Sequence, residues 1–204
     1  MAQTVPTKSN LLNVKKSYDL AKLGYDLMDR KRNILVREMM TLIDSAREKQ
    51  KEISALYAEA YEALAKAYIT LGDCDVFAEN VPVDRSVHIT RKSVMGVELT
   101  EIRHTRHLDF GQYGLMGTNS MLDEAYLKFQ KAKEMTIELA ALENNVCRLA
   151  DAVKKTKKRA NALENIMIPR FAGEVKFITD SLEEKEREDF SRLKVTKKQT
   201  KNKK

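Results

Sequence analysis

Apolar residues recur at alternating spacings of four and three along the first third of the chain, and this pattern predicts one long helix. The repeat consists of Val14, Tyr18, Ala21, Tyr25, Met28, Leu35, Met39, Leu42, Ala46, Ile53, Leu56, Ala60, Ala63 and Ala67. Only Arg32 and Lys49 interrupt it. A seven-residue period kept over this many turns is typical of a helix that supercoils left-handedly against a partner. Ser9 is a suitable N-cap for this helix and Gly72 a suitable stop.

The same pattern returns near Ser120 and continues to Leu182, which predicts a second long helix. Pro169 lies inside this second stripe. An interior proline removes one backbone hydrogen bond and its ring clashes with the carbonyl of Asn165, at a cost of ~3 kcal/mol. Because apolar residues continue from Phe171 onward at the same spacing, the pattern predicts a helix that runs through the proline with a kink.

Between the two stripes the pattern changes to strand-like alternation. Residues 86–91 and 97–102 alternate, with Met95-Gly96 between them, and this arrangement predicts a short β-hairpin. Residues 109–119 carry three glycines and are expected to form a loop. We expect this insert to lie at one end of the two helices, with both chain termini at the other.

These elements predict an all-α dominated fold, a long antiparallel two-helix left-handed coiled coil with a short β-hairpin insert between the helices. The expected divisions are residues 1–72 and 120–193 for the helices, 73–119 for the insert and 194–204 for a basic, unstructured tail. If Gly72 lies opposite Leu122, the register pairs Leu12 with Leu182 and places Lys49 beside Asn145. The polar interruptions of the two stripes would then share one layer and fix the register.

Composition supports few turns and argues against several function classes. The 204 residues include no tryptophan, seven glycines and three prolines, which disfavours sandwiches, barrels and alternating α/β folds. The net charge of +7 comes mainly from six lysines after residue 193, and the rest holds 31 basic against 30 acidic residues. A near-neutral body with no aromatic residues among its basic clusters disfavours nucleic-acid binding. We see no signal peptide and no stretch approaching the ~20 apolar residues of a membrane span. The two distant cysteines favour a reducing compartment.

Catalytic and metal-binding chemistry is scarce in this sequence. There is no glycine-rich phosphate loop and no arrangement typical of nucleophilic catalysis. His104 and His107 have a marginal metal-ligand spacing, without nearby cysteines or an acidic cluster. We therefore predict no enzyme activity, no metal and no cofactor.

A basic belt is the main candidate for a contact surface. It consists of Arg30, Lys31, Arg32 and Arg37 on the first helix and Lys154, Lys155, Lys157, Lys158 and Arg159 on the second. One interpretation is a solvated coiled-coil face. The other is a collar that meets acidic surfaces on a surrounding partner, with a strength that falls as salt rises. The pattern leaves both open.

Three short motifs in the second helix resemble the D subunit of V-type (vacuolar and archaeal-type) ATPases. They are Asn161-Ala162-Leu163-Glu164, Ile168-Pro169-Arg170 and Glu186-Arg187-Glu188. Pro6-Thr7-Lys8, Lys31-Arg32 and Met95-Gly96-Val97 also resemble that family, whereas Thr100 stands where the family often has proline. The resemblance covers nearly the whole chain.

The resemblance implies a non-catalytic rotor shaft in the central stalk. In that family the paired termini project into a hexameric ring of A and B subunits, where ATP is hydrolysed or made. The insert end, with the small F subunit alongside, points toward the membrane ring through a connecting subunit. The protein would then be cytoplasmic and peripheral to the membrane, and would transmit torque between ATP turnover and H⁺ or Na⁺ translocation. A free-standing coiled-coil scaffold or membrane-surface protein is the alternative.

Two groups of contact residues follow from combining the belt with the resemblance. Those expected to meet the catalytic ring are Arg30, Lys31, Arg32, Arg37, Lys157, Lys158, Arg159, Asn161, Glu164, Ile168, Pro169 and Arg170. Those expected to meet other rotor subunits are Val94, Met95, Gly96 and Val97.

Overall fold

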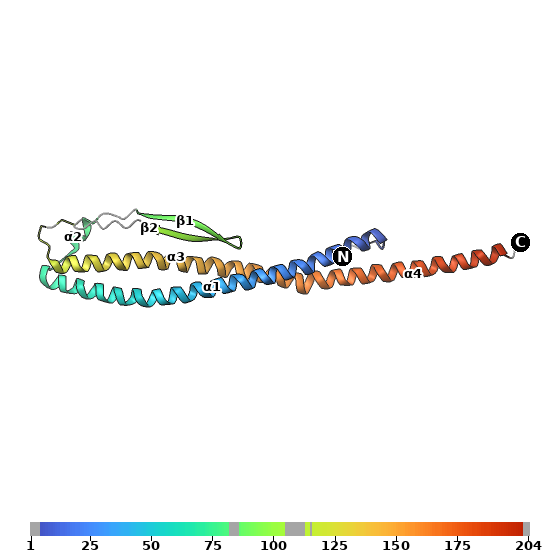
Figure 1. Ribbon diagram of the computed structural model, residues 1–204, viewed down its shortest axis with the longest axis horizontal. Coiled ribbons are helices and arrows are strands. Elements are labelled where there is room, and N and C mark those ends of the chain that lie inside the picture. Colours follow the sequence, from blue (N-terminus) through green and yellow to red (C-terminus); the bar gives the residue numbers. More distant parts are fainter. Residues whose placement is uncertain (1–4, 82–85, 105–112, 115, 202–204) are drawn as a thin grey trace. The chain divides into compact units, whose positions relative to one another are not determined.

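A computed structural model describes residues 5–81, 86–104, 113–114 and 116–201. The elements are α1 (Lys8–Leu71), α2 (Asp75–Glu79), β1 (Val87–Val94), β2 (Val97–His104), α3 (Ser120–Ala162), the π-helix η1 (Leu163–Met167) and α4 (Ile168–Lys201) (Figure 1). The predicted fold class, two long helices with a two-stranded antiparallel sheet between them, is confirmed. Internal contacts divide the chain into two units, Met1–Asn33 with Lys154–Lys204, and Ile34–Val153.

The first unit joins the beginning of α1 to the end of α3, η1 and α4. Its buried side chains include Ala21 on α1, Ala160 on α3 and Ile178 on α4. Lys8 forms an ion pair with Glu186, with 2.9 Å between Nζ and Oε1. Tyr25 interacts with Glu164 farther along. From Lys8 to Tyr25 the residue number on α1 increases, while the number of the contacted residue decreases from Glu186 to Glu164. The two helices of this unit therefore run antiparallel.

The second unit holds the rest of α1, most of α3 and the insert. Small buried residues dominate the facing sides of the two helices: Ala60, Ala63 and Ala67 on α1, and Ala125 and Ala132 on α3. The Tyr57 hydroxyl lies 3.1 Å from the Thr136 hydroxyl, and the Tyr61 and Phe129 rings meet edge to face with centroids 5.3 Å apart. These pairs show that α1 and α3 are also antiparallel here.

The expected pairing of Lys49 with Asn145 is wrong. Lys49 pairs with Glu138 at the exposed flank of the helix pair, because a lysine stem is long enough to carry its charge to a carboxylate at the edge. Asn145 instead binds the insert. The predicted pairing of Leu12 with Leu182 stays a prediction.

The ends of the long helices agree closely with the sequence, although the caps differ. α1 ends at Leu71, and Gly72 follows with a positive φ of 78°, as expected of a glycine stop. The α1 cap is Thr7 rather than Ser9, since its hydroxyl accepts the Asn10 N–H at 3.2 Å. At α3 the Asn119 side chain accepts the Leu122 N–H at 3.1 Å, so Asn119 caps the helix that begins at Ser120.

The insert forms the predicted hairpin but does not place it at the end of the helices. β1 pairs with β2 from Val94↔Val97 to Val87↔His104. Met95 and Gly96 both have positive φ, 51° and 76°, as a tight two-residue turn requires. The strands lie along α3 (Figure 1), and Thr100 is hydrogen-bonded to Asn145 in the interior of that helix. Thr100 itself lies inside a regular strand.

The structure also differs from the expected unstructured tail. Residues 194–201 continue α4, exposed throughout the part whose burial is described. No glycine or proline follows Gly173 in this helix, and lysine and glutamine are good helix formers. The Thr196 and Thr200 hydroxyls each donate to the carbonyl four residues earlier.

Candidate partner-contact surfaces

A π-turn lies immediately before Pro169. The Ile168 N–H bonds to the carbonyl of Leu163, five residues earlier instead of four. The backbone at Ala162 and Ile168 is helical, so the chain continues from α3 into α4 without a break, as predicted. A π-turn is wider than an α-turn. It falls where the proline ring would otherwise meet the carbonyl of Asn165.

The π-turn also keeps the inward-facing stripe in phase. The inward-facing positions around it are Thr156, Ala160, Leu163, Met167, Phe171, Glu174 and Ile178. From Leu163 to Phe171 the step is eight residues, where a regular repeat has seven. Because a π-turn holds one more residue than an α-turn, the extra residue does not rotate the rest of the stripe out of the interface.

Glu164, on the π-turn, makes a contact across the first unit. Its negative charge, with a hydrogen bond between the side chains, raises the pKa of the Tyr25 hydroxyl on α1. The side chain of Leu163 faces Gly24, where an added Cβ would lie 3.7 Å from Cδ1 of the leucine. These two contacts fix the height of α1 against η1. Glu164, predicted as a contact for the catalytic ring, therefore also has a role inside the unit.

The other predicted residues of this block lie mainly at the surface. Asn161, Pro169 and Arg170 are exposed, and Ile168 is half-buried. Arg170 pairs with Glu174 on its own helix, at 2.9 Å. Ile166 is also exposed but was not predicted from the sequence. An isoleucine at the surface of the widened turn adds exposed apolar area to this block.

The structure brings most of the basic belt to one level of the first unit. Since Tyr25 faces Glu164 in an antiparallel pair, residues 30–32 reach the height of residues 157–159. Arg32 is paired with Asp29 at 2.5 Å and also donates to Asn33. Among the described residues, no carboxylate lies within ion-pair distance of Arg30, Lys31, Lys154, Lys155, Lys157, Lys158 or Arg159. This level of the unit thus carries a concentration of uncompensated positive charge. Arg37 belongs to the second unit.

An exposed apolar row accompanies the belt on α1. Leu20, Leu23 and Leu27 are each more than half exposed and follow one another at spacings of three and four. Such a row on one face of a helix indicates an additional neighbour. In the sequence, Leu20, Leu27 and Ile34 lie beside the seven-residue repeat of the first helix and widen its apolar stripe.

The hairpin turn offers a smaller surface. Met95 and Gly96 are exposed, and Val94 and Val97 are half-buried where they pair. This turn lies farther along α3 than Asn145, away from the end of the helices. The predicted contact residues 94–97 are therefore together, but beside the helix pair.

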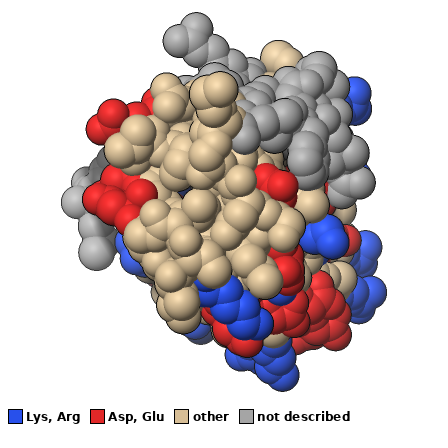
Figure 2. All heavy atoms as spheres, turned by 90° about the vertical axis from the view of Figure 1, so that its left-hand side faces the viewer, with Lys and Arg blue, Asp and Glu red and all other residues tan. Residues whose placement is uncertain are grey.

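The end of the second unit where α1 gives way to the insert is largely uncharged. Figure 2 shows this end as a patch of uncharged residues bordered by Lys, Arg, Asp and Glu. Its exposed apolar side chains include Ile69, Val76 and Met116, which are 84%, 66% and 96% exposed. Exposed apolar side chains within a charged rim are typical of a protein contact.

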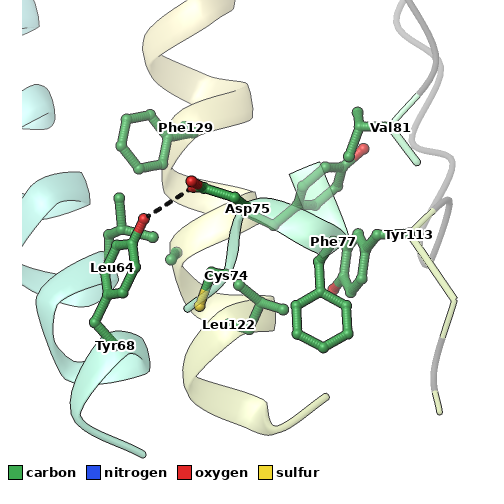
Figure 3. A pocket seen from close by; sticks show the side chains of 11 residues that line it. Leu64, Tyr68, Cys74, Asp75, Phe77, Val81, Tyr113, Leu122 and Phe129 are labelled. Atoms are coloured by element: carbon green, nitrogen blue, oxygen red, sulfur yellow. Dashed lines mark hydrogen bonds between the residues drawn. The ribbon is translucent and has the colours of Figure 1, made fainter. Parts of the chain in front are cut away.

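Behind this end lies an apolar cavity of about 260 Å³ (Figure 3). It is lined by Leu64, Tyr68, Cys74, Asp75, Phe77, Val81, Tyr113, Leu122, Ala125, Tyr126 and Phe129. The polar groups there are paired: Tyr68 donates to Asp75 at 3.5 Å, and Tyr113 donates to Asp123. Burial, followed by this bond to Asp123, raises the pKa of Tyr113. Burial also raises the pKa of the Cys74 thiol, which makes that cysteine a poor nucleophile.

Metal binding finds no support in the described residues. Within them no group of three His, Cys, Asp or Glu side chains could hold a metal ion. Of the two histidines with marginal spacing, His107 lies outside the described residues.

Comparison with known proteins decides the family. The sequence model of the family described as the D subunit of ATP synthase matches residues 10–198. The chain belongs to the ATP synthase D-subunit family. The V-type ATP synthase D subunit of Thermotoga neapolitana is 44% identical over 93% of this chain and 94% of its own. The A-type ATP synthase D subunit of Methanosphaera stadtmanae is 37% identical over 95% and 92%. That of Thermococcus gammatolerans is 36% identical over 94% and 92%.

Membership of the D-subunit family confirms the resemblance seen in the motifs. The chain is a central-stalk subunit of a rotary ATP synthase of the V or A type, and not its catalytic chain. In the part of the chain that the structure describes, no helix is both long and apolar enough to cross a membrane.

Proposed function

We propose that this D-subunit family member is the torque-carrying shaft between the A/B catalytic ring and the membrane ring. The supporting observation is the pair of long antiparallel helices, which pack against each other through many successive layers of buried side chains. Bending or twisting such a pair requires the disruption of several packed layers together. The shaft lies on the cytoplasmic side, peripheral to the membrane, and forces each catalytic site through its states by contact.

The ring contact is assigned to the first unit. Its uncompensated cations are suited to pair with carboxylates lining the A/B ring, and the leucine row beside them is suited to apolar contact. Arg32, Asn161, Glu164, Ile168, Pro169 and Arg170 complete this surface, with Arg37 as a separate contact from the second unit. The π-turn gives the surface a fixed, irregular shape, which a shaft needs if its contacts are to differ between catalytic sites.

The second unit is assigned to the other rotor parts. Val94, Met95, Gly96 and Val97 face the F subunit, since the hairpin turn lies beside the helix pair. The uncharged end with Ile69, Val76 and Met116 fits the connecting subunit, because exposed apolar side chains within a charged rim are suited to a lasting joint. This division gives each partner a surface of different chemistry.

Charge removal tests the ring contact. Lys157→Gln with Lys158→Gln removes two belt cations, and Arg47→Gln with Lys51→Gln removes two cations of α1 outside the belt. Affinity for the purified A/B ring, measured by surface plasmon resonance at several salt concentrations, should fall about tenfold and depend less steeply on salt in the belt variant alone. Equal affinities for both variants and the unmodified chain would overturn the assignment of the belt.

A further inference from the structure

Four hydrogen bonds from one turn of α3 hold the hairpin at a single point. The Thr100 N–H donates to Asn145 Oδ1 at 2.6 Å, and Asn145 Nδ2 donates to the Thr100 carbonyl at 2.8 Å. Asn144 Nδ2 donates to the Thr100 hydroxyl at 3.0 Å, and Arg148 donates to the Glu98 carbonyl at 3.1 Å. Thr100 and Asn145 are only 9% and 8% exposed.

The geometry is that of a strand edge paired with a helix. Along a strand, backbone groups of alternate residues point to the same edge, so residues 98 and 100 present theirs together. On α3, residues 144, 145 and 148 share a face at spacings of three and four. The amide of Asn145 uses one donor and one acceptor, as a peptide group does, and it takes the position of a neighbouring strand.

These bonds select one register between the hairpin and α3. A shift by one residue would bring Leu99 or Glu101 opposite Asn145, and the backbone groups of these residues point to the other edge, toward β1. A shift by two residues would move the strand by about 6.6 Å and separate the Thr100 hydroxyl from Asn144. An unpaired buried donor or acceptor is unfavourable, so the register with every group paired is preferred.

Apolar packing alone would hold the hairpin loosely. No residue of β1 is buried, and Ile89 is 68% exposed. Among the described side chains of β2, Thr100 is the one that is buried. The polar cluster therefore supplies most of the specificity with which the hairpin is placed.

We propose that Asn145, with Asn144 and Arg148, is a positioning latch that fixes the height of the Met95–Gly96 turn along α3 for its partner in the rotor. The partner in this statement rests on the proposed function, whereas the latch itself does not. Because the latch recognises backbone, it leaves the side chains of the turn free for contact.

Spin labels test the latch within the second unit. Cysteines replace the exposed residues Ser93 and Asp151, in a chain whose exposed Cys147 is changed to Ser. Pulsed EPR should give one narrow distance distribution, and Asn145→Ala should broaden it or add a second distance. Asn13→Ala, the same change at an exposed helical site, is the matched control. An unchanged narrow distribution in Asn145→Ala would overturn the latch.

A second variant acts from the hairpin side and leaves α3 intact. Thr100→Pro removes the N–H that points to Asn145, together with the hydroxyl that Asn144 binds, and proline is tolerated at such an outward edge position. It should broaden the same distance distribution while circular dichroism shows unchanged helix content. A narrow distribution in this variant would argue that neither bond plays a part in docking.

The partner is tested with the purified F subunit. A latch variant with a mobile hairpin should bind this protein at least about tenfold more weakly than the unmodified chain. Unchanged binding by a variant with a mobile hairpin would overturn the role of the latch in recognition. Failure of the unmodified chain to bind the F subunit would instead refute the partner in the proposed function and leave the EPR result standing.

Discussion

Pro169 shows how one residue sets the local geometry of a long helix. Its ring disfavours a regular α-turn, and the chain has the π-turn at residues 163–167 instead. The stripe around it contains one extra residue, so the two irregularities compensate each other. Neither would be favourable alone: the extra residue would rotate the stripe, and the proline would clash.

We predict that deletion of Asn165 exposes this compensation. The deletion restores a seven-residue step but forces Pro169 into a regular turn, so the first unit should lose about 3 kcal/mol. Adding Pro169→Ala to the deletion should recover most of that loss, because alanine has the missing N–H. The check is urea unfolding of the isolated chain, followed by circular dichroism. Equal stability of the two deletion variants would contradict the explanation.

At the ends and in the interior of the helices, two glycines differ in whether their backbone conformation requires glycine. Gly72 has a positive φ and ends α1, whereas Gly173 lies inside α4 with helical geometry. A Cβ at either position would meet no atom within 4 Å. Backbone conformation therefore decides the effect of substitution at both sites.

We predict opposite effects for the two glycine substitutions. Gly72→Ala should destabilise the chain by about 1–2 kcal/mol, since a left-handed conformation is costly for alanine. Gly173→Ala should stabilise it by about 0.5–1 kcal/mol. Thermal unfolding of both variants provides the comparison. A destabilised Gly173→Ala variant would show that α4 needs flexibility at this position.

The sequence predicts those elements whose signals are local. The end of α1, the start of α3 and the hairpin turn follow from Gly72, from the onset of the stripe at Ser120 and from Met95-Gly96. The docking of the hairpin could not be predicted, because Asn145 reads as an ordinary polar interruption until a strand lies against it. The π-turn had a signal in the eight-residue step before Phe171. The helical tail was missed because its charge suggested disorder more strongly than its helix propensity suggested order.

For the whole molecule, the two units carry different surfaces. The first has unpaired cations and a leucine row, and the second has the latched hairpin and an uncharged end. The candidate residues fall into these groups because the antiparallel helices bring residues distant in sequence to one level. Arg30 and Lys157 share a level only through this pairing.

We predict that truncation from Arg159 onward uncouples ATP turnover from ion translocation. The truncated chain loses η1, α4 and most of the helix that pairs with α1 in the first unit. Changes in the catalytic ring can then no longer rotate the shaft through this surface. Reconstituted vesicles should show ATP hydrolysis with little ion uptake, measured in parallel on complexes that retain the chain. Ion uptake per ATP equal to that of the intact complex would contradict the shaft role.

The backbone recognition by Asn145 has a consequence for how this protein can change. Because the latch binds mainly backbone N–H and C=O groups, it places few demands on neighbouring side chains. Most of the hairpin sequence can therefore be exchanged. Replacement of residues 87–94 and most of 97–104 by another hairpin should keep its placement wherever residue 100 has a free N–H and a hydroxyl. The Met95–Gly96 turn can thus diversify while the helices beneath it stay the same.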